Sequence, residues 1–202
     1  MKVIKVVPFG FACNSYILTA DNKTAVVIDP YDRRVLKVLE QNNLECKYVL
    51  LSHGHFDHVG LCGKFFEIGA HICCNEREKD YIFSAENRQL LGGVHIPDFK
   101  IFRTFTDEEK YTLCGINFTA IHTPGHTAGS MCYITEDCLF SGDTLFRAGV
   151  GRTDLPTGSF VELTNSIKKL FELSGDLKVY PGHGEDTTLN FERNYNPFVA
   201  TL

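Results

Sequence analysis

The pattern of apolar and polar positions predicts a series of short strands in the first part of the chain. Short apolar runs are bounded by turn residues, which is typical of strands. Asp21-Asn22-Lys23 supplies such a turn, so the runs before and after it predict a hairpin. The strands predicted in this part are residues 3–7, 15–19, 24–28, 46–51 and 70–74.

The second half of the chain repeats this pattern. Residues 111–114 and 116–121 predict a hairpin about Gly115. Residues 130–135 and 138–141 predict another, which turns at Glu136-Asp137. A last strand is expected over residues 177–180.

Helical periodicity lies between and after these strands. Asp32 is a plausible N-cap of a helix to Gln41, and further helices are expected over residues 58–65 and from Asn75 or Glu76 to Phe83. Ser159 and Glu162 form a predicted capping box. The apolar face of the helix that follows it comprises Phe160, Leu163, Ile167, Leu170 and Phe171. Strands followed by helices in both halves indicate two sheets packed between helices.

Residues 84–104 are the least regular stretch, with Gly92-Gly93, Pro97 and few periodic signals. Loops of more than about 15 residues are uncommon in compact domains and are often functional. The stretch therefore suggests either a lid over a substrate or a surface excursion with a short helix.

Composition narrows the class of protein. A chain of 202 residues with 44% hydrophobic and 22% charged residues suits a globular protein with one core. The net charge of -5 and the lack of a basic run argue against a nucleic-acid partner. No apolar stretch approaches the roughly 20 residues that cross a bilayer, and the first residues do not resemble a secretory signal, so no membrane partner and a cytoplasmic location are expected.

Eight cysteines occur without any C-x-x-C pair. They match neither a zinc ribbon nor a thioredoxin-like redox motif. Without a secretory signal a disulfide framework is not expected, and most of the cysteines have apolar neighbours. The interpretation is that they are small buried hydrophobic residues in a reducing compartment.

A cluster of potential metal ligands follows the predicted strand 46–51. His53, His55, Asp57 and His58 lie within six positions of one another. Imidazole suits zinc, iron and related ions, and a carboxylate can bridge two ions. With only 8 histidines in the chain, three so close together indicate a metal site and not a chance surface loop.

Three later positions repeat this arrangement of a polar ligand just after a strand. His126 follows the strand that ends at Ile121, Asp143 follows the strand that ends at Ser141, and His183 follows Tyr180. Glycine or proline stands beside each of the three, which allows the tight turns that aim a side chain at one point. The sequence therefore predicts that these side chains join the cluster at 53–58.

These motifs resemble the metallo-β-lactamase superfamily and, within it, the glyoxalase II-like thioester hydrolases. The resemblance covers nearly the whole chain. It rests on the H-x-H-x-D-H run at 53–58, Thr-Pro-Gly-His-Thr at 123–127, Gly-Asp-Thr-Leu-Phe at 142–146, Gly-Arg-Thr-Asp at 151–154 and Tyr-Pro-Gly-His-Gly at 180–184.

The resemblance implies an α+β fold, a four-layer αββα sandwich of two mixed β-sheets flanked by helices. It implies a single domain over residues 1–202, without the C-terminal helical domain of full-length glyoxalase II enzymes. It also implies two divalent metal ions, with zinc expected and iron or manganese as alternatives that the same ligands accept. Carried over by position, the ligands are His53, His55 and His126 for the first ion, Asp57, His58 and His183 for the second, and Asp143 as the bridge.

The implied activity is hydrolysis of an acyl thioester such as S-lactoylglutathione through a metal-bound hydroxide, with Asp57 as a catalytic residue that steers the hydroxide proton. Arg152 stands where these enzymes carry a basic residue that meets the glutathione carboxylate, although it could equally pair with Asp154. Asp154 and Glu185 replace tyrosines of those enzymes. Another thiol carrier, or another small thioester or ester substrate, therefore stays open.

Three alternative functions remain. An iron-dependent persulfide dioxygenase shares the fold and would use one metal, held by His53, His126 and Asp143. A lactonase or β-lactamase would keep the fold and change the substrate. A non-catalytic metal-binding module is disfavoured, because structural zinc sites favour thiolates and close at four ligands. His71 and His95 match no ligand position and are expected to be structural, and His122 is either a strand-end residue or a supporting neighbour of the site.

Overall fold

The computed structural model describes residues 1–10, 13–90 and 98–202. The first of two six-stranded sheets is formed by consecutive strands in chain order: β1 (Lys2–Val6), β2 (Ser15–Thr19), β3 (Thr24–Ile28), β4 (Glu45–Leu50), β5 (His71–Asn75) and β6 (Ile101–Phe105). The β1–β2 and β2–β3 pairs are antiparallel, whereas the β3–β4, β4–β5 and β5–β6 pairs are parallel. The sheet is therefore mixed.

The second sheet is also mixed. Its strands, in spatial order, are β14 (Thr187–Thr188), β13 (Lys178–Pro181), β10 (Cys138–Gly142), β9 (Met131–Thr135), β8 (Ile116–His122) and β7 (Glu109–Leu113). Only the β10–β13 pair is parallel among the pairs of this sheet. A separate two-stranded ribbon joins β11 (Leu145–Phe146) to β12 (Gly149–Val150).

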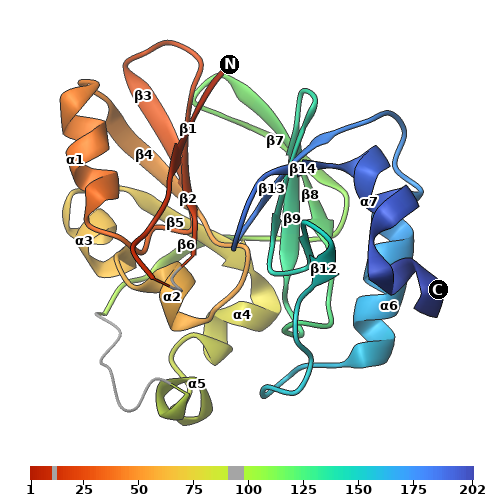
Figure 1. Ribbon diagram of the computed structural model, residues 1–202. Helices are drawn as coiled ribbons and strands as arrows, with labels where there is room; N and C mark the ends of the chain where they lie inside the picture. The colour runs from red at the N-terminus through yellow and green to blue at the C-terminus, as the bar shows by residue number, and fades with distance from the viewer. Residues whose placement is uncertain (11–12, 91–97) are drawn as a thin grey trace.

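Helices lie outside both sheets, which makes four layers (Figure 1). Helices α1 (Arg34–Gln41) and α3 (Cys62–Glu67) cover the first sheet, and α6 (Phe160–Phe171) and α7 (Leu189–Tyr195) cover the second. The remaining helical segments are α2 (Phe56–Val59), α4 (Glu76–Tyr81), α5 (Ala85–Gln89) and the 3₁₀ turn η1 (Pro197–Thr201). None of the helices in the described ranges is long and apolar enough to cross a bilayer.

The core consists of three apolar layers. Strand β3 shows why its sequence is apolar throughout: Ala25 and Val27 face the helices, whereas Val26 and Ile28 face the other sheet. A strand buried on both faces has no polar side, so it reads as a continuous apolar run. Aromatic side chains fill much of the space between the sheets, including Tyr16, Phe118, Tyr133 and Phe140.

The predicted fold class is confirmed, as are the three predicted hairpins. The predicted helix over 58–65 is wrong, because two short helices, α2 and α3, replace it. Phe160, which was predicted on the buried face of α6, is 54% exposed. The described part of the stretch 84–104 contains α5 and the start of β6, while residues 91–97 lie outside the described residues. The lid hypothesis for that stretch stays a prediction.

Candidate metal centre

The ends of four strands meet at one edge of the two sheets. Strand β4 of the first sheet leads into the loop that carries His53 and His55. In the second sheet, β8, β10 and β13 run in the same direction, so their carboxyl ends lie at one edge. His126, Asp143 and His183 follow these three strands. Both sheets therefore contribute side chains to one site.

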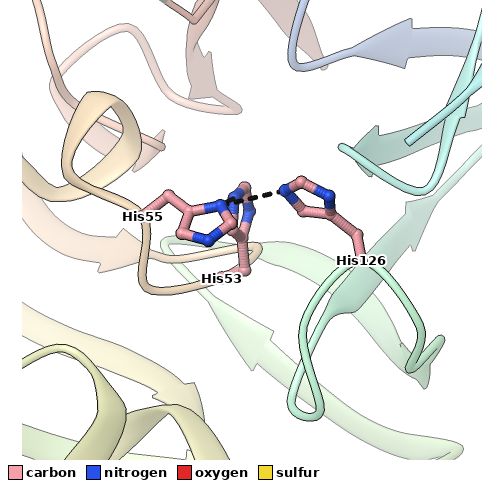
Figure 2. A group of neighbouring side chains, drawn as sticks. All are labelled: His53, His55 and His126. Carbon is pink, nitrogen blue, oxygen red and sulfur yellow. Dashed lines mark hydrogen bonds between the residues drawn. The ribbon is translucent and has the colours of Figure 1, made fainter. Parts of the chain in front are cut away.

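The first cluster is a trio of buried imidazoles, His53, His55 and His126. Figure 2 shows the three rings turned toward one another from two different loops. His55 Nδ1 lies 3.0 Å from His53 Nε2 and 2.9 Å from His126 Nε2. Three nitrogen donors thus converge on one point.

The second cluster surrounds Asp143. His183 Nε2 lies 3.3 Å from Asp57 Oδ2 and 3.4 Å from Asp143 Oδ2, and His58 Nε2 lies 3.4 Å from Asp143 Oδ1. Asp143 Oδ2 is also 3.5 Å from His126 Nε2 of the first cluster. All seven residues predicted as ligands are therefore neighbours, with the Asp143 carboxylate between the two clusters.

The two clusters differ in their protonation. Burial, together with the charges of neighbouring imidazoles, lowers the pKa of His55 to about 3 and that of His53 well below its usual range. Burial also acts to lower the pKa of His183, but hydrogen bonds to the carboxylates of Asp143 and Asp57 outweigh it and raise this pKa to about 9. These shifts favour the neutral form of His53 and His55, which is the form in which imidazole binds metals.

Several polar atoms of the site have no hydrogen-bond partner among the described residues. They are His55 Nε2, His58 Nε2 and Asp143 Oδ1. Buried polar atoms without a partner are rare in folded proteins and call for an explanation such as a bound ion. Three groups of residues could each hold a metal ion, because the donor atoms within each group lie within 4.8 Å of one another. The groups are His53, His55 and His126; His53, His58 and Asp143; and Asp57, His58 and His183.

A supporting residue that the sequence analysis missed is Asp29, at the end of β3. Its carboxylate accepts hydrogen bonds from Ser52 N at 2.7 Å and Ser52 Oγ at 2.6 Å, and lies 2.9 Å from His58 Nδ1. Such a contact fixes the ring so that Nε2 points into the site. The available signal was an acidic residue at the end of the strand that pairs with β4.

Close packing also fixes the carboxylate of Asp143. A Cβ atom placed on Gly182 would lie 2.2 Å from Asp143 Oδ1 and 2.9 Å from His58 Cε1. The turn that carries His183 can therefore approach Asp143 only because position 182 has no side chain.

A cavity of about 540 Å³ opens onto the clusters. Part of its wall is apolar and comprises Phe56, Leu90, Phe146, Val150 and Leu155. Arg152 also lines it, but its guanidinium makes two hydrogen bonds of 2.7 Å to the Asp154 carboxylate. Arg147 is likewise paired with Glu185. Both of these arginines are thus paired with acids of the chain.

Two further histidines of the described residues, His71 and His122, lie apart from the clusters. His122 ends β8, and its Nε2 is 3.0 Å from Ala128 O, which agrees with a strand-end role. His71 is exposed and stacks on Phe102. His95 lies outside the described residues.

Comparison with known proteins agrees with this geometry. The model of the metallo-beta-lactamase superfamily matches residues 8–183. The hydroxyacylglutathione hydrolase GloC of Haemophilus influenzae is 36% identical over 206 residues, which cover 97% of this chain and 97% of that protein. The BLEG-1 B3 metallo-beta-lactamase superposes with a TM-score of 0.89 at 32% identity and covers 98% of this chain and 99% of its own. TTHA1623, solved in a di-iron-bound form, superposes with a TM-score of 0.84 at 30% identity, and the match covers 98% of this chain and 100% of that protein.

The family match covers most of the chain, and the relatives align with it over almost their whole length. Their sheets and helices superpose on those described above. The chain therefore belongs to the metallo-beta-lactamase superfamily, as one of its glyoxalase II-like members.

Proposed function

We propose that this protein hydrolyses an acyl thioester and uses two divalent metal ions to do so. The observation that carries the proposal is the convergence of six donor residues, from both sheets, on the two sides of the Asp143 carboxylate, which is the seventh. Seven donors exceed what one closed four-coordinate site accepts, but they suit two ions that keep open positions.

In this proposal Asp143 would be a ligand common to both ions. His53, His55 and His126 would hold the first ion, Asp57, His58 and His183 would hold the second, and Asp143 would serve both as the bridge. The unpaired atoms His58 Nε2 and Asp143 Oδ1 support this fit. They lie 3.4 Å apart, and neither has another hydrogen-bond partner among the described residues, so both are available to a cation.

When bound, two such ions supply a water of lowered pKa and polarise the substrate carbonyl. The residues of the chain do the rest. Asp57, which lines the cavity, would steer the proton of the attacking hydroxide, which makes it the proposed catalytic residue. The apolar wall of Phe56, Phe146 and Val150 receives the acyl group and limits the access of bulk water.

The name of GloC supports a thioester of glutathione as the substrate class. Arg152, on the cavity wall, is the proposed contact for a carboxylate of the thiol carrier. The acids paired with Arg152 and Arg147 weaken the case for glutathione itself. S-Lactoylglutathione is therefore the first substrate to test, beside a thioester with an uncharged carrier.

Zinc is the metal that we propose, since imidazole and carboxylate ligands suit it. The same ligands accept iron or manganese, and TTHA1623 was solved in a di-iron-bound form. Elemental analysis of anaerobically purified protein decides between these metals. Two equivalents of metal per chain are expected.

Substitution of the proposed ligands tests the assignment. His55→Ala and Asp143→Ala are expected to lose metal and thioester hydrolysis together, because each removes a donor that no neighbour replaces. His71→Ala is the control, since that histidine is exposed and apart from the site. Full turnover by either ligand variant would contradict the assignment.

β-Lactam hydrolysis is the second candidate, favoured by the close superposition on the BLEG-1 B3 metallo-beta-lactamase. A substrate panel separates the two, with thioesters, lactones and β-lactams tested on the same metal-loaded protein. Oxygen uptake on glutathione persulfide adds a test of the dioxygenase alternative. Oxygen consumption without hydrolysis of any thioester would replace our proposal with that alternative.

We further propose that residues 1–202 act as a single domain in the cytoplasm. Its partner would be a small-molecule thioester, and no nucleic acid is expected. All eight cysteines are free, which supports a reducing compartment.

A further inference from the structure

Glu78, on helix α4, is a buried carboxylate that joins two loops of the site. It is only 1% exposed. Its Oε2 accepts a hydrogen bond from Gly54 N at 2.6 Å, and its Oε1 accepts from Thr127 Oγ1 at 2.6 Å and from Gly129 N at 2.8 Å. One side chain therefore holds both the loop of His53 and His55 and the loop of His126.

Both loops approach Glu78 so closely that only glycine fits at the contacts. A Cβ atom on Gly54 would lie 2.7 Å from Glu78 Oε2, and one on Gly129 would lie 2.7 Å from Glu78 Oε1. The next peptide group is also held, because Gly54 O accepts a hydrogen bond of 2.7 Å from Asn87 Nδ2. Both peptide groups between His53 and His55 are thus fixed.

Burial of the Glu78 carboxylate costs free energy. No cation among the described residues forms an ion pair with it, so its charge is met by the three neutral donors alone. Burial outweighs these hydrogen bonds and raises the pKa of Glu78 above its ordinary value. Since a buried carboxylate without a cation depends on its hydrogen bonds, Glu78 and the donors of the two loops hold one another in place.

The second cluster is fixed by other residues. Asp29 contacts His58 Nδ1, and the backbone around His183 is held by Asn14, whose N donates to Gly182 O at 2.6 Å. Glu78 touches neither of these contacts. Its removal should therefore disturb the three-histidine cluster more than the cluster around His183.

We infer that Glu78 is a positioning residue that sets the spacing between the His53–His55 loop and the His126 loop, and so the affinity of the three-histidine cluster for a divalent metal ion. This inference rests on the proposed metal centre. It extends that proposal by giving the two metal sites different means of support within the fold.

The test compares Glu78→Gln with a matched control, Glu192→Gln. Glu192 is also fully buried and also accepts three hydrogen bonds from neutral donors, namely Thr187 Oγ1, Ala148 N and Asn196 Nδ2. It lies on α7 and holds none of the seven donor residues. Both variants replace one acceptor oxygen by an amide NH₂, so both should lose similar stability.

The measurement is titration of the metal-free proteins with Zn²⁺ against a chromophoric chelator. One of the two binding steps of Glu78→Gln should weaken about 10- to 100-fold, the usual effect of losing a residue that orients metal ligands. Glu192→Gln should bind Zn²⁺ like the unaltered protein. Unchanged binding by Glu78→Gln, or an equal loss in both variants, would overturn the inference.

Thr127→Val and Thr127→Ser keep the test usable if Glu78→Gln does not fold. Valine removes the hydroxyl donor to Glu78 at nearly constant shape and should weaken the same binding step, whereas serine keeps the hydroxyl and should restore it. Failure of the unaltered protein to bind two Zn²⁺ ions would end both the proposed function and this inference. Binding of two ions with no effect at Glu78 and Thr127 would end the inference alone.

Discussion

Arg152 and Asp154 form a bidentate pair on the wall of the cavity, and both side chains are more than half exposed. Exposed pairs of this kind are weak, because water and salt screen them. A carboxylate on a substrate can therefore compete with Asp154 for the guanidinium. If Arg152 is the proposed substrate contact, we expect Asp154 to discriminate against carriers that bear carboxylates.

Asp154→Asn tests this discrimination. We expect kcat/KM for S-lactoylglutathione to rise about two- to five-fold relative to an uncharged thioester, as the loss of a weak exposed pair allows. Asp32→Asn is a matched control, because Asp32 makes the same bidentate contact with Arg34 away from the cavity. A ratio of the two kcat/KM values that does not change would rule out competition by Asp154.

At the scale of single residues, the sequence indicates those that occur in dense local patterns. His53, His55, Asp57 and His58 stand together in the chain, so their chemistry can be recognised without a structure. Asp29 and Glu78 are single acids among 25 Asp and Glu residues, and only tertiary contacts distinguish them. That is why their supporting roles could not be predicted.

Among the elements, helix α6 shows how a local signal fixes a boundary. Ser159 Oγ accepts a hydrogen bond from Glu162 N at 3.3 Å and so satisfies one of the free donors at the start of the helix. Its apolar stripe of Leu163, Ile167 and Leu170 packs on the second sheet.

Ser159→Ala should lower the free energy of unfolding by about 1 kcal/mol, because it removes this cap. Thr164→Ala, one turn further into the same helix, serves as the control. Alanine has the higher helix propensity, so that change should be neutral or slightly stabilising. Urea denaturation of both variants gives the comparison, and equal stabilities would show that the cap contributes nothing.

The wrong predictions of helical structure are each explained by a contact with a segment that is distant in the sequence. The chain leaves its helical course between α2 and α3, where Leu61 N donates to Pro30 O at 3.0 Å. The helical periodicity of residues 58–65 contains no information about that partner. Phe160 likewise lies near Phe198 of the C-terminal turn, with ring centroids 5.7 Å apart, and not in the core beneath α6.

For the whole molecule, the number and type of layers followed from the sequence, whereas the strand order did not. Short apolar runs and amphipathic helices suffice to predict two sheets between helices. The neighbours β10 and β13 are separated by α6 and about 35 residues of chain, and their pairing depends on contacts that no local pattern contains.

Burial across these layers should make the cysteines unreactive in the folded protein. Burial raises the pKa of Cys132 to about 11 and that of Cys73 to about 12, and every cysteine except the half-buried Cys114 is buried. At pH 8 a thiol reagent should label at most about one cysteine in the native state, because the thiolate is the reactive form. It should label all eight in denaturant. Rapid labelling of several thiols in the native protein would contradict this burial. So would rapid labelling of one thiol in the native Cys114→Ser variant.

The distance between the two sheets has a consequence for the choice of ion. His53 and His55 extend from one sheet and His126 from the other, and Tyr133 Oη of the second sheet donates to Leu51 O, beside β4 of the first, at 2.7 Å. The thickness of the aromatic interior thus sets how far apart the two loops begin, and Glu78 then joins them. We therefore expect selectivity for ionic radius to depend on interior packing as well as on the ligands, so a scaffold redesigned for a larger cation would need bulkier side chains between the sheets.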